Sequence, residues 1–389
     1  MAIVKLDYSA LPMTSATANT TYVLDADENR SIGSGFMFDL AATQGLKFVL
    51  NGSLYSGGVL FDYGTTGQPA PAIRVNVGST AYMEGDNGAF LIAGDGSVLH
   101  NEGTIASSSS VAVGMSGVGV RMENEGTLLA FDASAVLMSG SDLHFENSGI
   151  IGGGVSISSA AGSTSTIINS GLINSAGIAV LAGNGDDTVI NSGIIRVGVR
   201  MGNGDDRFID KGGRVTSAVE GGAGNDLFVI KSGDFDLRES NGGGDDTVKS
   251  SVSWVLDQDF EIGRLTGSKN INLTASDDGT FLYGNTGNNK LIGGLGIDRL
   301  DGGRGNDILT GDGNADQFVF KAGCGKDVIA DFVDGADKID LQNYKGIVAF
   351  GDLEAKQDGK DLVVELQGGD TITLRNFDKA DLSAADFAF

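Results

Sequence analysis

Short runs of Ile, Val and Leu alternate with glycine turns over much of the chain, and the turns recur at a regular spacing. Turns that contain an asparagine lie at Asn51, Asn76, Asn101, Asn124, Asn147, Asn169 and Asn191, which are 22 to 25 residues apart. A period of this length, with strand-like runs around each turn, predicts one coil of a parallel β-helix per repeat. Parallel connections are almost always right-handed, so we expect a right-handed helix.

The asparagines should stack on one another, because each recurs at the same place in its coil. Stacked amides can donate and accept hydrogen bonds along the stack, which satisfies polar groups close to a core. A sugar-binding ladder is the alternative interpretation of these residues.

A second kind of turn joins the first from residue 182. The segments AGNGDDTVI, MGNGDDRFI, GGAGNDLFV and NGGGDDTVK each carry an aspartate at the sixth position, at Asp187, Asp206, Asp226 and Asp246. A single such segment could be an ordinary Gly-Asp turn. Four copies at intervals of 19 or 20 residues favour a repeated ligand position.

Between Gly284 and Val319 the period shortens to nine residues, in the units GNTGNNKLI, GGLGIDRLD, GGRGNDILT and GDGNADQFV. The glycines permit a tightly curved backbone, and the eighth position is always apolar. The sixth position is Asn289, Asp298, Asp307 and Asp316 in turn, so the first unit departs from the pattern.

Carboxylates and backbone carbonyls held between stacked turns are the oxygen ligands that calcium prefers. The sequence therefore predicts Ca²⁺ as the cofactor of these turns. The candidate ligands are sixth-position aspartates and turn glycines: Asp187, Asp206, Asp226, Asp246, Gly294, Gly296, Asp298, Gly303, Gly305, Asp307 and Asp316.

These nonapeptides resemble the RTX (repeat-in-toxin, hemolysin-type) family, whose repeats form a parallel β-roll. The segment from Lys326 to Tyr344 resembles the region after the repeats in serralysin-type proteins, and the closing LRNFDKADLSAADFAF resembles their acidic, Phe-ending tails. The resemblance implies type I secretion with an uncleaved C-terminal signal. The N-terminus has no basic segment followed by an apolar core, which fits that route.

We therefore expect an all-β fold, a right-handed parallel β-helix that continues into a calcium-binding β-roll. The predicted segments are an N-terminal cap or anchor at 1–48, a β-helix with the asparagine ladder at 49–181, coils with calcium-type turns at 182–249, a spacer at 250–283, the nonapeptide roll at 284–319, and a C-terminal cap with the secretion signal at 320–389.

The composition excludes several classes of protein. There are 26 Lys and Arg against 51 Asp and Glu, a net charge of -25 that should repel nucleic acid and anionic membranes. No apolar run reaches the roughly 18 residues of a transmembrane helix. Cys324 is the only cysteine, so an intramolecular disulfide is excluded.

Catalytic motifs are also missing. The only histidines are His100 and His144, so the zinc-protease motif H-E-x-x-H is absent, and neither G-x-S-x-G nor a Walker loop occurs. A polysaccharide lyase or epimerase would need a base near neutralised uronates. The candidates are few, at Arg74, Tyr82, Arg121, Arg196 and Arg200, and no Asp-Pro occurs.

We therefore predict a non-enzymatic extracellular protein that folds on calcium after secretion. It would serve as a surface-layer, biofilm-matrix or adhesive component, with copies of itself and a cell-surface polysaccharide as candidate partners. The alternatives are a polysaccharide lyase or epimerase and a carbohydrate-binding module, each with an RTX export tail.

Overall fold

The structure is a computed structural model that describes residues 2–6, 13, 16–26, 29–32, 37–40, 45–64, 70–233, 236–240 and 243–389. The predicted N-terminal segment 1–48 therefore lies partly outside the described residues. The chain divides into two compact units. Unit 1 comprises Met1–Gly224 and Asp234–Leu237, and unit 2 comprises Asn225–Gly233 and Arg238–Phe389. The described residues contain no helix long and apolar enough to cross a membrane.

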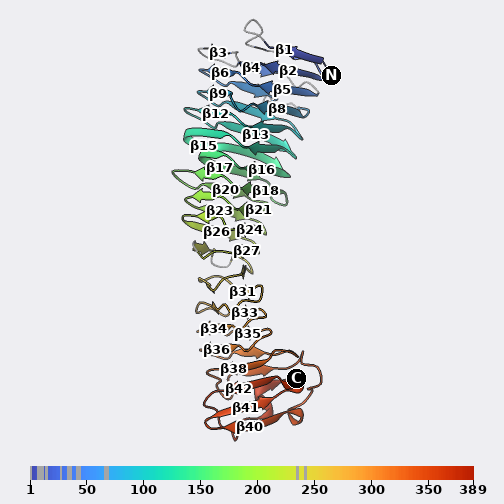
Figure 1. The fold of residues 1–389 in the computed structure, drawn as a ribbon, viewed down its shortest axis with the longest axis vertical. Coiled ribbons are helices and arrows are strands. Elements are labelled where there is room, and N and C mark those ends of the chain that lie inside the picture. Colours follow the sequence, from blue (N-terminus) through green and yellow to red (C-terminus); the bar gives the residue numbers. More distant parts are fainter. Residues whose placement is uncertain are drawn as a thin grey trace. The chain divides into compact units, whose positions relative to one another are not determined.

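Unit 1 is a stack of coils, each with three strands that pair in parallel with the coils before and after (Figure 1). The strands of the first face are β1 (Ala2–Lys5), β2 (Thr20–Leu24), β5 (Leu46–Leu50), β8 (Ile73–Val77), β11 (Val98–Asn101), β14 (Arg121–Asn124), β16 (Leu143–Asn147), β18 (Thr164–Asn169), β21 (Asp186–Asn191) and β24 (Arg207–Asp210).

The second face consists of β3 (Asn29–Ile32), β6 (Ser53–Ser56), β9 (Tyr82–Gly85), β12 (Thr104–Ser107), β19 (Leu172–Asn174), β22 (Ile194–Arg196) and β25 (Arg214–Val215). The third consists of β4 (Phe38–Leu40), β7 (Phe61–Tyr63), β10 (Phe90–Ala93), β13 (Val113–Val118), β20 (Val180–Gly183), β23 (Val199–Asn203) and β26 (Ala218–Ala223). The long strands β15 (Thr127–Ser141) and β17 (Ile150–Ser159) run through both faces.

The asparagine ladder is confirmed from Asn101 to Asn191. Each Nδ2 donates to the Oδ1 of the next asparagine, Asn101 to Asn124 to Asn147 to Asn169 to Asn191, at 2.7–2.8 Å. Each turn glycine packs directly on the one before, so that a Cβ at Gly149 would collide with the carbonyl of Gly126. Asn51 and Asn76 were wrongly assigned to this ladder, because the residues in register with Asn101 are Val77 and, one coil earlier, Leu50.

Unit 2 is a stack with two strands per coil. One sheet contains β27 (Leu227–Ile230), β29 (Thr247–Ser250), β31 (Ile262–Leu265), β33 (Phe281–Tyr283), β35 (Arg299–Asp301), β37 (Gln317–Val319), β39 (Lys338–Asp340) and β43 (Phe387–Ala388). The other contains β30 (Trp254–Val255), β32 (Leu273–Thr274), β34 (Lys290–Gly294), β36 (Ile308–Asp312), β38 (Lys326–Ile329) and β42 (Thr371–Leu374). Strand β28 (Asp236–Arg238) has residues in both units.

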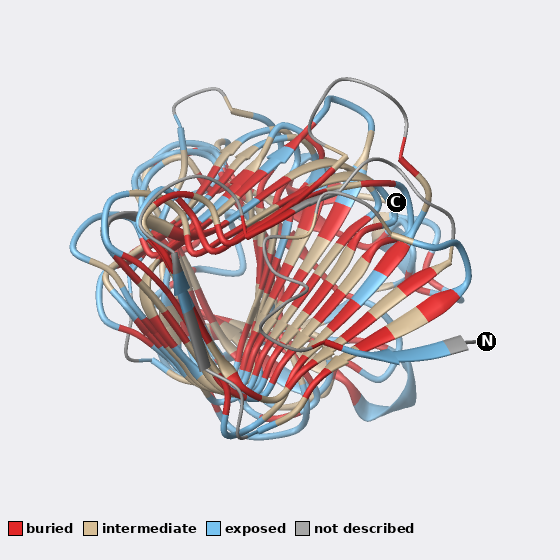
Figure 2. Cartoon of the chain, turned by 90° about the horizontal axis from the view of Figure 1, so that it is seen from above, coloured by how far each residue is buried: buried red, intermediate tan, exposed pale blue. Residues whose placement is uncertain are grey.

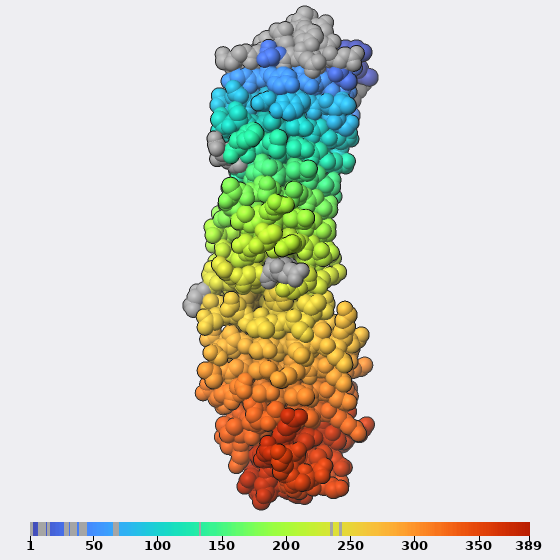
Figure 3. All heavy atoms as spheres, turned by 60° about the vertical axis from the view of Figure 1, so that its left-hand side comes forward, coloured from blue at the N-terminus to red at the C-terminus, as the bar shows by residue number. Residues whose placement is uncertain are grey.

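The second sheet of unit 2 ends in an antiparallel hairpin, β40 (Glu354–Asp358) and β41 (Asp361–Glu365), which pairs with β42. Three short 3₁₀ helices accompany this end, η2 (Phe350–Asp352), η3 (Gln367–Gly369) and η4 (Ala384–Asp386), and the described residues contain no α-helix. Coils therefore continue past the nonapeptides, and in the space-filling view the colours of unit 2 run in chain order from yellow to red (Figure 3).

Each core is filled by every second residue of its strands, because successive side chains of a strand point to opposite faces. Seen along the stack, buried positions recur at the same place in successive coils (Figure 2). In unit 1 the rings of Phe38, Phe48, Phe61 and Phe90 pack with centroids 5.0–5.7 Å apart. In unit 2 the eighth positions of the nonapeptides are fully buried, as expected, at Leu291, Leu300, Leu309 and Phe318.

Candidate metal centre

The nonapeptide turns lie alternately on two edges of unit 2. Turns 284–289 and 302–307 lead into β34 and β36, which pair with each other, whereas turns 293–298 and 311–316 lead into the paired strands β35 and β37. Turns that stack are therefore 18 residues apart. Consecutive nonapeptides do not stack on each other.

The sixth-position carboxylates form a column along each edge. On one edge Asp316 Oδ1 accepts a hydrogen bond from the Asp298 amide at 2.9 Å, and Asp298 Oδ1 accepts one from the Thr280 amide at 2.7 Å. On the other edge Asp307 Oδ1 accepts from the Asn289 amide at 2.7 Å. One oxygen of each carboxylate thus fastens its coil to the preceding one.

The other oxygen of these carboxylates is the feature that calls for a cation. Oδ2 of Asp298 and of Asp307 is buried and has no hydrogen-bond partner among the described residues. Burial raises the pKa of both groups to about 7 and that of Asp316 to about 6. A buried carboxylate is costly unless a charge compensates it, and a hard cation bound by oxygen atoms would do so.

Glycine at the first position of a turn makes room beside this oxygen. A Cβ on Gly302 would lie 2.5 Å from Asp307 Oδ2, and one on Gly293 or Gly311 would collide with Oδ2 of Asp298 or Asp316. The donor set and this space fit a calcium ion.

The four glycines predicted as ligands have a backbone role in the same turns. Gly294, Gly303 and Gly305 have φ of 107°, 89° and 129°, values that favour glycine. Gly296 lacks a positive φ, but a Cβ there would collide with the backbone at Asp278. Their carbonyls remain predicted ligands.

The first nonapeptide differs, as its sequence suggested. Asn289 Oδ1 accepts from the Asn285 amide at 2.8 Å, and its Nδ2 donates to the Ile271 carbonyl at 2.7 Å. A neutral amide satisfies this turn with hydrogen bonds alone.

The upstream aspartates also stack, in pairs that lie within one unit. In unit 1 Asp206 Oδ1 accepts from the Asp187 amide at 2.7 Å. Asp187 differs from the others, because Ser165 and Ser159 donate to its two oxygens at 2.5 and 3.3 Å. In unit 2 Asp246 Oδ1 accepts from the Asp226 amide at 2.7 Å. The turn before Asp246 begins at Asn241 and Gly242, which lie outside the described residues.

The columns extend further than the sequence indicated. Asp337 accepts from the Asp316 amide at 3.0 Å, Asp327 from the Asp307 amide at 2.8 Å, and Glu261 from the Asp246 amide at 2.6 Å. The turns before Glu261 and Asp337 lack the pair of glycines at the second and fourth positions, so the motif does not find them. The turn before Asp327 carries Gly323 and Gly325 at these positions and was overlooked. Their separation along the sequence is a further signal of the columns, since Asp327 and Asp337 follow Asp307 and Asp316 by 20 and 21 residues.

Comparison with known proteins agrees with this geometry. The family model for the RTX calcium-binding nonapeptide repeat (4 copies) matches residues 283–318. No curated protein matches the chain. Among solved structures, the extracellular lipase LipA from Serratia marcescens is 20% identical over 61% of this chain and 45% of that one, less than half its length, with a TM-score of 0.28. A likeness that weak does not bear on activity. Residues 283–318 are therefore RTX-type nonapeptide repeats, which bind calcium.

Proposed function

We propose that this is a non-enzymatic extracellular protein that folds on calcium after type I secretion and serves as a structural surface-layer, biofilm-matrix or adhesive component. The observation that carries the proposal is the column of buried carboxylates with unpartnered oxygens at Asp298 and Asp307. Without calcium these charges oppose stacking, and metal binding then becomes folding free energy. In low-calcium cytosol the acidic repeats cannot stack, which keeps that part of the chain extended and able to be threaded through a secretion channel.

The ion pairs of two candidate bases, Arg121 and Arg200, support a non-enzymatic role. Arg121 pairs with Glu123 and Glu146, and Arg200 Nε donates to Glu220 at 2.8 Å. An arginine held in such surface ion pairs stays protonated and is not poised to abstract a proton from a substrate.

The N-terminal end of unit 1 supports self-assembly. Among the described residues β1 pairs with β2 alone, and Ile3 of β1 is 74% exposed. An unpaired parallel edge with exposed apolar residues is a template for another chain. A second copy is the proposed occupant, in a contact that forms a polymer or a closed oligomer according to its symmetry.

Calcium titration of chelator-stripped full-length protein tests the folding proposal. We expect β-sheet circular dichroism to increase at roughly millimolar or lower free calcium, as the calcium-type coils fold, and magnesium at the same concentration to give no increase. Electron microscopy of the calcium-loaded sample tests assembly. Circular dichroism that does not change up to millimolar calcium contradicts the folding proposal, and particles that stay single contradict the assembly proposal.

One feature favours the carbohydrate-binding alternative. A hollow of 390 Å³ in unit 2 is lined by Tyr283, Arg304 and Lys321 among others. The Arg264 guanidinium lies 3.8 Å from the Tyr283 ring centroid, so aromatic and cationic groups meet in an otherwise acidic chain. Retention on an acidic-polysaccharide column that Arg304→Gln abolishes would favour binding, and new ultraviolet absorbance on a polyuronate would reveal a lyase.

A further inference from the structure

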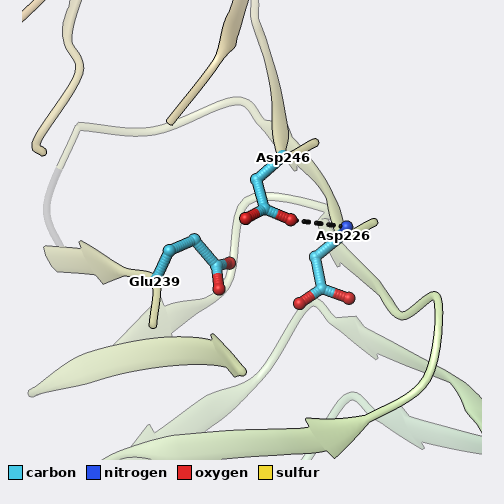
Figure 4. A group of neighbouring side chains, drawn as sticks. All are labelled: Asp226, Glu239 and Asp246. Atoms are coloured by element: carbon cyan, nitrogen blue, oxygen red, sulfur yellow. Dashed lines mark hydrogen bonds between the residues drawn. The ribbon is translucent and has the colours of Figure 1, made fainter. Parts of the chain in front are cut away.

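Three carboxylates converge in unit 2, outside the nonapeptides. One ligand oxygen from each of Asp226, Glu239 and Asp246 lies within 4.8 Å of the other two (Figure 4). Asp226 and Asp246 directly precede the paired strands β27 and β29. Glu239 directly follows β28 and belongs to no repeat position.

The Asp246 side chain points into this group and has one oxygen that no hydrogen bond satisfies. Asp246 is 1% exposed, and its Oδ1 accepts from the Asp226 amide. Its Oδ2 is buried with no hydrogen-bond partner among the described residues, and the carboxylate faces Glu239 (Figure 4). Asp226 is also buried, so water does little to screen the repulsion among the three charges.

The spacing suits calcium. Calcium binds oxygen at about 2.3–2.6 Å, so ligands on opposite sides of the ion are about 4.6–5.2 Å apart. Three oxygens within 4.8 Å of one another can share one such coordination sphere. Zinc favours nitrogen and sulfur ligands, and none is present in this group.

We propose that Asp226, Glu239 and Asp246 form a three-carboxylate calcium site, in which Glu239 binds the ion directly. Stacked nonapeptide turns supply sixth-position carboxylates in pairs, such as Asp298 with Asp316. Because calcium affinity rises with the charge of the ligands, the three-carboxylate site fills at lower free calcium than the nonapeptide sites. The inference rests on the proposed uptake of calcium by this chain.

Competition between chromophoric chelators and the chelator-stripped full-length protein, with calcium chloride as titrant, tests the site. In Glu239→Gln we expect the tightest-binding class of sites to hold one calcium ion fewer, or its calcium affinity to fall at least about tenfold. Glu354→Gln, which removes an exposed carboxylate from β40, should leave every class unchanged. Circular dichroism at saturating calcium verifies that both variants fold.

The outcomes separate this site from the proposed function. Calcium binding by the wild type with an identical titration of folded Glu239→Gln overturns the three-carboxylate site alone. Absence of calcium binding in the wild type overturns both. If Glu239→Gln fails to fold, Glu239→Asp, which keeps the charge on a shorter arm, should fold and bind with intermediate affinity, and wild-type affinity in that variant would count against direct ligation.

Discussion

The asparagine ladder of unit 1 and the aspartate columns of unit 2 solve the same stacking problem with different chemistry. An amide both donates and accepts, so Asn124, Asn147 and Asn169 satisfy one another without help. A carboxylate only accepts, so Asp298 and Asp307 take a backbone N–H on one oxygen and leave the other without a partner. The replacement of a nitrogen by an oxygen turns a self-sufficient stack into one that needs a cation.

Removal of calcium should produce the largest difference between the asparagine ladder and the aspartate columns. In a chelator at pH 7.5, we expect amide hydrogens of residues 284–327 to lose protection, because the buried charges are then uncompensated. Residues 98–174 should stay protected, since their ladder contains no ionised group. Hydrogen exchange with mass spectrometry resolves the two regions, and equal loss in both would contradict the distinction.

Acidity should partly substitute for calcium. The raised pKa values, about 7 for Asp246, Asp298, Asp307 and Asp327 and about 6 for Asp316, mean that the calcium-free folded chain holds protons that the unfolded chain releases near pH 4. Folding therefore takes up protons, and stability without calcium falls as the pH rises from about 4 to about 7. Urea unfolding in calcium-free buffer at pH 5 and pH 8 measures this. With calcium the sign reverses, because protons compete with the ion.

Asn147→Asp should damage the self-sufficient stack. The new carboxylate cannot donate to Asn169 Oδ1 or to the Gly149 carbonyl, and it places a charge beside both acceptors. We expect unit 1 to lose about 3 kcal/mol of unfolding free energy, with or without calcium. Ser148→Asp, which adds the same charge at an exposed neighbour, is the control in the same denaturation experiment. Equal losses in the two variants would mean that the ladder bonds contribute nothing.

Asp307→Asn is the converse change and should have a smaller effect that depends on calcium. Without calcium the variant should be more stable than the wild type, because a buried charge is gone. At calcium one hundred times the dissociation constant, it should lose about 2.7 kcal/mol of ion-linked stability. Thermal unfolding with and without calcium tests whether the order of stability of variant and wild type reverses. A variant whose stability responds to calcium as that of the wild type does would show that Asp307 is not a ligand.

Much of this arrangement is predictable because it is local and repeated. The sixth-position aspartates, the buried eighth positions and the asparagine stack follow from period and residue type. The sequence did not predict Glu261 and Asp337 as members of the columns, because the glycine motif does not mark their turns. Asn76 shows the opposite error: it sits near a turn, but the strand register places Val77 in the ladder instead.

The sequence by itself determined the coil, its alternating core and the kind of ligand each turn offers, since these depend on neighbours a few residues away. The tertiary structure decided which turns meet. Two strands per coil send consecutive nonapeptides to opposite edges, so Asp298 meets Asp316 and never Asp307. It also brought Glu239 to Asp226 and Asp246. Such contacts depend on how the chain returns to the same edge, and a linear period does not encode that return.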